Sequence, residues 1–265
     1  MPIERLICIQ NVSKEVFDVR DKIVMRCAYD AQNALGRLCD EKVYETDLTR
    51  RLRAVGFREV HTQVPVRVVH GDFQKEYRCD LVADDVLYEL KTVRALVAEH
   101  EAQVLNYAML LSINHGKLIN FRNARVEGKL QFNAIDEATR YRFTCDSSLF
   151  CPLSAECEEL QEFTTSLLED WGAFLDFNLY QEALVHHFSS AGHGHCRAAL
   201  TFEGIKLGMQ DFSFHHPEVC FVVSGYQEPG GMTSHYLRLL ALSEFKGMQW
   251  INMHHDTIGF RTLVR

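Results

Sequence analysis

The stretch YRCDLVADDVLYELK, Tyr77 to Lys91, decides the fold expected for this chain of 265 residues. It contains two apolar segments separated by Asp84-Asp85, a pair that fits a two-residue hairpin turn. Residues that face each other across this turn have numbers adding to 169, which places Asp80 opposite Glu89. Because side chains alternate between the two faces of a strand, Lys91 lies on the same face as Glu89. The hairpin therefore predicts that two acids and one lysine converge.

Two carboxylates on opposed strand residues, with Cβ atoms about 5 Å apart, repel each other unless a cation or a proton lies between them. Mg²⁺ prefers oxygen ligands and shares its remaining positions with water and substrate phosphate. A lysine beside such a site can position the attacking water and stabilise charge that develops on the phosphoryl oxygens. The triplet predicts metal-dependent phosphodiester hydrolysis, and the alternative interpretation is a solvated strand face with a surface ion pair.

The segments around the hairpin predict a mixed sheet flanked by helices. Apolar residues at helical spacing indicate a first helix from Ser13 to Leu35. The residues that share this spacing are Val16, Val19, Ile23, Cys27, Ala31 and Ala34. Further helices are expected at about residues 40–55 and 99–111, and further strands at residues 60–71, 116–121 and 126–132. The order ααβββαββ is that of an α/β or α+β domain.

The second half of the chain repeats this order at an offset of about 132 residues. We expect a first domain at residues 1–144, a linker at 145–157 and a degenerate second copy at 158–265. The segments VYETDLTRRL and HGKLINFRN, for example, are echoed by LYQEALVHHF and KGMQWINMHH, although chance similarity between amphipathic segments is an alternative. In this alignment the second copy has lost the ionisable triplet, with the following counterparts: Val222 for Glu89, Ser224 for Lys91, and positions near Ser213 for Asp80 and near His235 for Gln103.

The charge is unevenly distributed between the two halves. The net charge is −8, but residues 1–150 hold 22 basic and 22 acidic residues, whereas residues 151–265 hold 6 and 14. A nucleic-acid surface, which requires basic residues, is therefore expected in the first half. Arg50, Arg51 and Arg53 late in the second helix could contribute to it or could be solvated charge.

Several motifs in the first half occur together in a specific order. They are LGRLCDEKVYE, RLRAVGF, QVPVRV, YRCDLVADDVLYELKTV, HEAQVLNYAMLL and GKLINF. Over about residues 15 to 133 the chain resembles the GxxExxY family of the PD-(D/E)XK nuclease superfamily. The resemblance departs from the family pattern at Leu38, which stands where the motif has its first glycine, so the loop geometry there is in doubt.

The resemblance implies a restriction-endonuclease-like fold and a role for each matching residue. Asp80 and Glu89 look like the ligands of Mg²⁺ or Mn²⁺, and Glu41 is a further acid that we expect to point at the metal. Lys91 looks like the catalytic lysine, and Gln103 with Tyr107 looks like the Q-x₃-Y element of RecB-type nucleases. Tyr44 matches the motif that names the family, and we expect Tyr44, Tyr107 and Arg78, the last across from Lys91, to contact substrate. Three residues have a simpler interpretation: Gln103, Glu41 and Glu45 could be ordinary exposed helix residues.

The predicted function is metal-dependent cleavage of nucleic acid by the first half, with DNA favoured over RNA. The alternative is an inactive binding or scaffold protein that keeps the fold and binds nucleic acid or a protein partner. The acidic second half favours this alternative and offers a surface for a protein partner. The sequence contains no apolar run of the roughly 20 residues that a membrane helix needs, and the nine cysteines follow no disulfide pattern. We therefore expect a cytoplasmic protein that does not enter the membrane.

Overall fold

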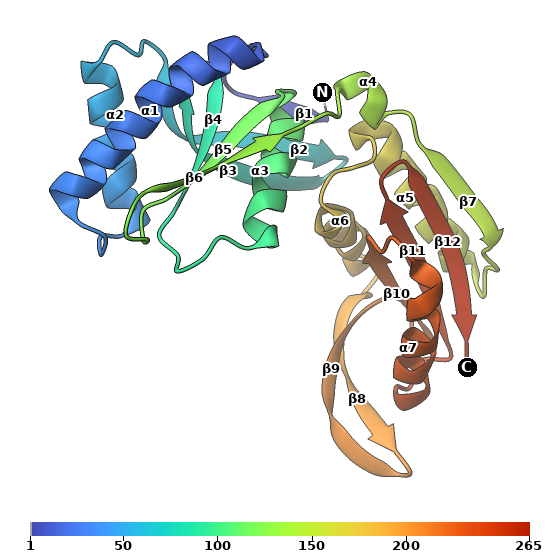
Figure 1. Ribbon diagram of the computed structural model, residues 1–265. Helices are drawn as coiled ribbons and strands as arrows, with labels where there is room; N and C mark the ends of the chain where they lie inside the picture. Colours follow the sequence, from blue (N-terminus) through green and yellow to red (C-terminus); the bar gives the residue numbers. More distant parts are fainter. Residues whose placement is uncertain (1) are drawn as a thin grey trace. The chain divides into compact units, whose positions relative to one another are not determined.

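The computed structural model describes residues 2–265, which divide into two compact units. Within the described residues, the first unit comprises residues 2–69 and 74–139, and the second comprises residues 70–73 and 140–265. Each unit contains a six-stranded mixed sheet flanked by helices, as predicted (Figure 1). In the described part of the chain, no helix is both long enough and apolar enough to cross a membrane.

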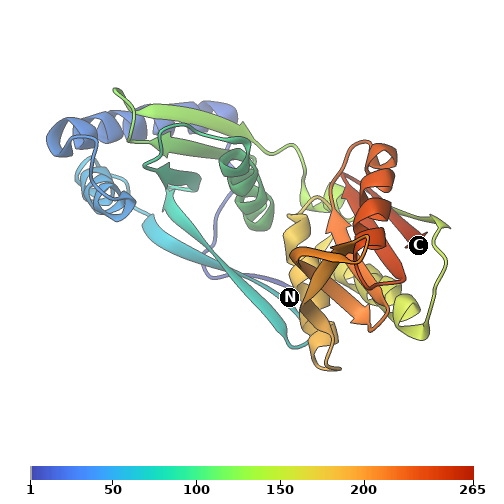
Figure 2. The same cartoon turned by 90° about the horizontal axis from the view of Figure 1, so that it is seen from below.

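The first unit is built around the sheet β1-β2-β3-β4-β5-β6. Its strands are β1 (Ile3–Arg5), β2 (Val60–His70), β3 (Phe73–Ala83), β4 (Val86–Lys91), β5 (His115–Asn120) and β6 (Glu127–Phe132), and its helices are α1 (Lys14–Leu35), α2 (Glu41–Ala54), α3 (Ala98–Leu111) and the start of α4 (Glu137–Arg140). Strands β4 and β5 are parallel, whereas β3 with β4 and β5 with β6 are antiparallel. The long pair β2 and β3 extends past the shorter β4 (Figure 2).

The hairpin that joins β3 to β4 has the predicted register. Leu81 pairs with Tyr88 and Ala83 with Val86, so facing residues add to 169. Asp84 and Asp85 form the turn with φ angles of 43° and 68°, the left-handed conformations that a type I′ hairpin requires. The Asp84 carboxylate accepts hydrogen bonds from two backbone N–H groups of the loop before β2, which holds the turn against the sheet.

The core of the first unit lies between the sheet and helices α1 and α2. Tyr88 and Leu90 of β4 enter this core together with Leu48 and Leu52 of α2. The other face of β4 is covered by α3, where a Cβ built on Gly116 of the neighbouring β5 would lie 2.6 Å from Val104 Cγ1 and 3.3 Å from Leu87 Cδ2. Alternation along β4 therefore directs even-numbered side chains toward α1 and α2, and odd-numbered side chains toward α3.

The second unit has the same order of elements around the sheet β7-β12-β11-β10-β9-β8. Its helices are α5 (Ala155–Trp171), α6 (Phe177–Ser189) and α7 (Pro229–Leu242), and its strands are β7 (Thr144–Leu149), β8 (Gly194–Phe202), β9 (Ile205–His216), β10 (Val219–Ser224), β11 (Gly247–His254) and β12 (Thr257–Val264). Strands β10 and β11 are parallel, and their outer neighbours β9 and β12 are antiparallel to them, as in the first unit. Strands β8 to β12 thus repeat the arrangement of β2 to β6. The first strand differs, because β1 pairs with β2 whereas β7 pairs with β12 at the opposite edge of its sheet. Five strands of matching connectivity fit a duplicated fold.

The stretch expected to be a linker, residues 145–157, contains regular structure. Residues 145–149 belong to β7, which pairs in parallel with β12, and residues 155–157 are the start of α5. Pro152 and the nearby serines lie between the end of the edge strand β7 and the N-terminus of α5. Such a turn has the same composition as a linker, which is why the sequence suggested a linker here.

Candidate functional site

The candidate site lies where β3 and β4 separate beyond the last paired residues of the hairpin. The recorded pairs end at Leu81 and Tyr88, and the next residues exchange side-chain bonds with the opposite backbone. The Asp80 carboxylate accepts a hydrogen bond from the N–H of Leu90 at 2.9 Å, and the Glu89 carboxylate lies 3.5 Å from the N–H of Asp80. Asp80 and Glu89 are therefore brought together, as the hairpin register predicts.

Both acids are deeply buried, which is unusual for carboxylates. Asp80 is 8% exposed and Glu89 is 2% exposed. Burial, reinforced by the charge of Asp80, raises the pKa of Glu89 to about 8. The pair is thus destabilised in its doubly ionised form, and a cation bound between the two acids would relieve that repulsion.

Lys91 provides one positive charge beside this pair. Its Nζ donates to Glu89 Oε1 at 2.8 Å, and its side chain is 12% exposed. Burial lowers the pKa of Lys91, but the charges of Glu89, Asp80 and Glu41 outweigh this effect, so that the pKa is raised and the ammonium is maintained. One lysine cannot neutralise both Asp80 and Glu89 when both are ionised.

Helix α2 contributes further acids to the same region. Burial raises the pKa of Glu41, and the Asp80 and Glu45 charges add to this effect while Lys91 opposes it. Glu45, one turn further along α2, is 3% exposed and is not the ordinary surface residue that its position in an amphipathic helix allowed. The acids of α2 and those of the hairpin therefore share one electrostatic environment.

Gln63 connects these two groups of acids. Its Nε2 donates to Glu45 Oε2 at 2.6 Å and to Asp80 Oδ1 at 3.2 Å. Gln63 has a φ of 52° within β2, and non-glycine residues held in this region are strained and cluster at functional sites. The residue occurs in the quoted segment QVPVRV, but no periodicity indicates its conformation, and only the tertiary contacts show its role.

Gln103 and Tyr107, the residues expected at the site from α3, form a hydrogen bond with each other. Gln103 Nε2 donates to the Tyr107 hydroxyl at 3.0 Å, as expected for residues one helical turn apart. Burial raises the pKa of Tyr107 to about 12, with smaller contributions from the Glu89 and Asp80 charges. Gln103 and Tyr107 thus lie on the side of the sheet toward which Glu89 and Lys91 point.

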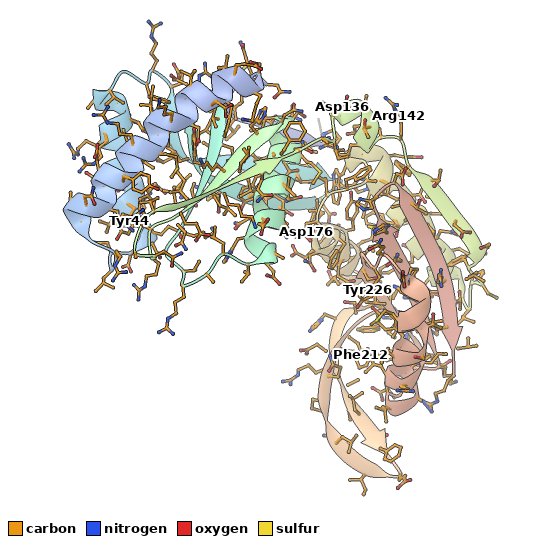
Figure 3. The ribbon with its side chains drawn as sticks, viewed as in Figure 1. Tyr44, Asp136, Arg142, Asp176, Phe212 and Tyr226 are labelled. Atoms are coloured by element: carbon orange, nitrogen blue, oxygen red, sulfur yellow. The ribbon has the colours of Figure 1, made fainter. Side chains whose placement is uncertain are left out.

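Two expected substrate contacts have other environments in the structure. Tyr44 has no exposed surface, stacks on Phe121 with ring centroids 4.3 Å apart, and donates its hydroxyl to the Gly36 carbonyl (Figure 3). Tyr44 therefore stabilises the core and the loop between α1 and α2, and the expectation that it contacts substrate is wrong. Arg78 is exposed and pairs with Glu76 at 2.5 Å, and no strand pairing is recorded between Arg78 and Lys91.

The corresponding region of the second unit contains aromatic residues in place of the acids. Ser224, the last residue of β10, accepts a hydrogen bond from Trp250 Nε1 at 2.7 Å. Trp250 is fully buried and lies against Tyr236, with ring centroids 4.8 Å apart, and against Tyr226. The space at the end of β10 is therefore filled by the core of the second unit.

The described part of the first unit offers two carboxylates for a hard divalent cation and no complete set of protein ligands. Within residues 2–265, no group of three or more His, Cys, Asp or Glu side chains is arranged to hold a metal ion. Mg²⁺ is commonly bound through one or two carboxylates, with water and substrate phosphate completing its shell. Asp80 and Glu89, buried together with the pKa of Glu89 raised, match that requirement.

Comparison with known proteins gives one family match. Residues 18–131 match the model of the PD-(D/E)XK nuclease superfamily. The match covers most of the first unit and none of residues 140–265. No curated protein matches the chain. A solved structure described as "Crystal structure of SSO0001" is 20% identical over 44% of this chain and 68% of that chain, with a TM-score of 0.29, a likeness too weak to support an argument.

Proposed function

We propose that the first unit is a metal-dependent nuclease that hydrolyses phosphodiester bonds of nucleic acid, DNA in preference to RNA. The observation that carries this proposal is the buried Asp80–Glu89 pair with Lys91 Nζ 2.8 Å from Glu89. The superfamily match of residues 18–131 supports it. The quoted motifs, which resemble those of the GxxExxY family, are a second reason to propose it. Resemblance to restriction-endonuclease-like and RecB-type enzymes is the reason to favour DNA.

In this proposal Asp80 and Glu89 hold Mg²⁺ or Mn²⁺, with Glu41 as a further acid facing the ion. When bound, the ion would lower the pKa of a water molecule and neutralise charge on the phosphoryl group. Lys91 donates a hydrogen bond to the attacking water and stabilises the negative charge that grows during in-line attack. Its bond to Glu89 fixes the ammonium in the position where that charge develops.

The neighbouring residues position this machinery. Gln63 uses its two N–H groups to hold the carboxylates of Glu45 and Asp80, which leaves Asp80 Oδ2 fixed by the Leu90 N–H. Gln103 and Tyr107 border the site from α3, where the amide or the hydroxyl can bind a phosphate oxygen of the substrate. These groups are preorganised, so they need little rearrangement as charge develops.

The decisive experiment is incubation of the purified full chain with single- and double-stranded DNA and RNA in the presence of Mg²⁺ or Mn²⁺. We expect metal-dependent cleavage that is lost in Lys91→Ala and in Glu89→Ala, with circular dichroism showing that both variants remain folded. Cleavage that persists unchanged in both variants would refute the assignment.

The second candidate is a binding or scaffold protein without turnover. The specific observation in its favour is the charge of residues 151–265, which hold 6 basic and 14 acidic residues. In that case the acidic half would be the surface for a protein partner. Calorimetry with Mg²⁺ or Mn²⁺ distinguishes the two proposals, because a protein that only binds has no need of an ion between Asp80 and Glu89.

A further inference from the structure

A surface hollow of about 400 Å³ lies between α2 and β2 of the first unit. It is lined by three basic side chains and three hydroxyl side chains, together with the edge of Glu45. The basic residues are Lys42, Arg50 and Arg53, and the hydroxyl residues are Thr46, Thr49 and Thr62. Cations and hydroxyl donors are the groups that bind phosphate oxygens in nucleic-acid complexes.

Thr49 provides an independent indication that this hollow binds a ligand. The residue is 8% exposed, and its Oγ1 is buried without a hydrogen-bond partner. A threonine within a helix ordinarily bonds the carbonyl four residues earlier, as Thr46 Oγ1 does with Lys42 O at 2.8 Å. A buried hydroxyl without a partner is costly, which favours an external acceptor at this position.

The hollow also has an excess of positive charge. Arg50 and Arg51 share the single carboxylate of Asp47, so one of these two guanidinium charges remains uncompensated. Arg53 donates to the Val60 carbonyl at 2.9 Å, which fixes its guanidinium beside β2. The first half of the chain is neutral as a whole, so this excess is local.

The hollow is connected to the candidate site through Glu45 and Gln63. Glu45 lies at its edge, and Gln63 bonds both Glu45 and Asp80. An adjoining hollow of about 390 Å³ shares Lys42, Thr46 and Arg50 and adds Leu35, Val43 and Asp47. Leu35 and Val43 are apolar side chains suited to a sugar or a base. A strand cleaved at Asp80 and Glu89 can therefore continue along α2.

We propose that this hollow binds a backbone phosphate of the nucleic-acid strand, other than the one that is hydrolysed. The inference rests on the proposed function, because it names the surface by which the same site holds its substrate. Thr49 donates its hydroxyl to a phosphate oxygen, and Arg50 supplies the charge that the Asp47 carboxylate leaves uncompensated.

The test measures binding of a fluorescent single-stranded oligonucleotide to the full chain carrying Lys91→Ala, so that cleavage does not interfere. Adding Arg50→Gln is expected to weaken binding about threefold to tenfold and to reduce the slope of log K against log salt by about 0.7, the value for one contact with single-stranded nucleic acid. Arg51→Gln is the control. Arg51 carries the same charge and also pairs with Asp47, but it does not line the hollow, so its removal is expected to change the slope less. Equal effects of Arg50→Gln and Arg51→Gln would overturn the proposal.

Thr49→Val provides a second and independent readout. The substitution preserves shape and removes the unpartnered hydroxyl, so the variant should be at least as thermally stable as its parent while binding the oligonucleotide about threefold more weakly. Unchanged binding would overturn the assignment of Thr49. Inorganic phosphate is the comparison probe. If it bound as tightly as the oligonucleotide, with both affinities expressed per phosphate group, the hollow would bind free anions and not a strand. These measurements involve binding alone, so a failure to cleave refutes the nuclease proposal without affecting them.

Discussion

The two units share a scaffold but differ at the one position where chemistry is expected. In both, a glycine with φ near 77° ends the first helix, and a tyrosine eight residues later donates its hydroxyl to that glycine's carbonyl: Gly36 with Tyr44, and Gly172 with Tyr180. In both, an asparagine in the last part of the fifth strand bonds the backbone N–H and carbonyl of a residue just beyond the fourth strand. These pairs are Asn120 with Val93 and Asn252 with Tyr226. These contacts are structural and do not depend on catalytic residues.

The acids of the first unit have no equivalents in the second. Ser224 takes the place of Lys91, and Gln181 of α6 takes the place of Glu45. The N–H of Leu90 bonds the Asp80 carboxylate, whereas the corresponding N–H of Val223 bonds the Gln181 amide oxygen at 2.7 Å. The comparison shows that the fold satisfies the same backbone group with a neutral side chain, so the fold itself does not require the buried acids.

The largest effect is expected when Lys91, the proposed catalytic lysine, is replaced by serine, the residue at the equivalent position of the second unit. Lys91→Ser should reduce metal-dependent cleavage by at least about 100-fold, because it removes a charge that stabilises the transition state. The rate of cleavage of labelled DNA measures the effect. Ser224→Ala in the second unit is the matched control and should leave that rate unchanged; a comparable loss there would mean that both units take part in catalysis.

The next effect concerns the pH dependence of stability in metal-free protein. Glu89 retains its proton in the folded state up to about pH 8 but loses it near pH 4.5 when unfolded, so the folded state binds more protons in this window. Stability should therefore fall as the pH rises from 6 to 8, by about 2 kcal/mol at 1.36 kcal/mol per pH unit. Glu89→Gln should remove this slope in denaturant unfolding, and Mg²⁺ should stabilise the wild-type protein more at pH 8 than at pH 6. A wild-type protein whose stability does not change over this range would contradict the assigned burial.

A smaller effect should distinguish the two equivalent glycines. Both have positive φ, so replacement by alanine costs about 1–2 kcal/mol at either position. A Cβ on Gly172 would also lie 2.8 Å from the Arg140 carbonyl oxygen, whereas one on Gly36 meets no atom within 4 Å. Gly172→Ala should therefore destabilise its own unit more than Gly36→Ala does, which hydrogen exchange in each unit can measure. Equal losses would show that the backbone conformation alone determines the cost.

The smallest effect is expected at the two tyrosines. Tyr44→Phe and Tyr180→Phe each remove one hydroxyl bond to a glycine carbonyl, and each should destabilise its own unit by about 1 kcal/mol. Thermal unfolding followed by hydrogen exchange in each unit tests this equality. If Tyr44→Phe weakened nucleic-acid binding without loss of stability, Tyr44 would contact substrate after all.

Helix α1 illustrates where sequence periodicity is insufficient. Its bounds were predicted to within a residue, and Cys27 and Ala31 of the expected apolar face are buried. The other members of that face are exposed, namely Val16, Val19, Ile23 and Ala34, while Phe17 and Val24 are buried instead. A helix with apolar residues on most of its circumference has more than one candidate face, and the face that packs is chosen by the sheet it meets. The same limitation applied to Glu45, whose burial depends on Gln63.

The sequence by itself determined the order of the elements, the hairpin register and the convergence of Asp80, Glu89 and Lys91, because alternation and a two-residue turn fix which side chains face each other. The tertiary structure alone decided that Gln63 joins Glu45 to Asp80, that Tyr44 is a core residue and that Thr49 faces a basic hollow. These features depend on contacts between segments distant in the chain, and local periodicity carries no information about such contacts.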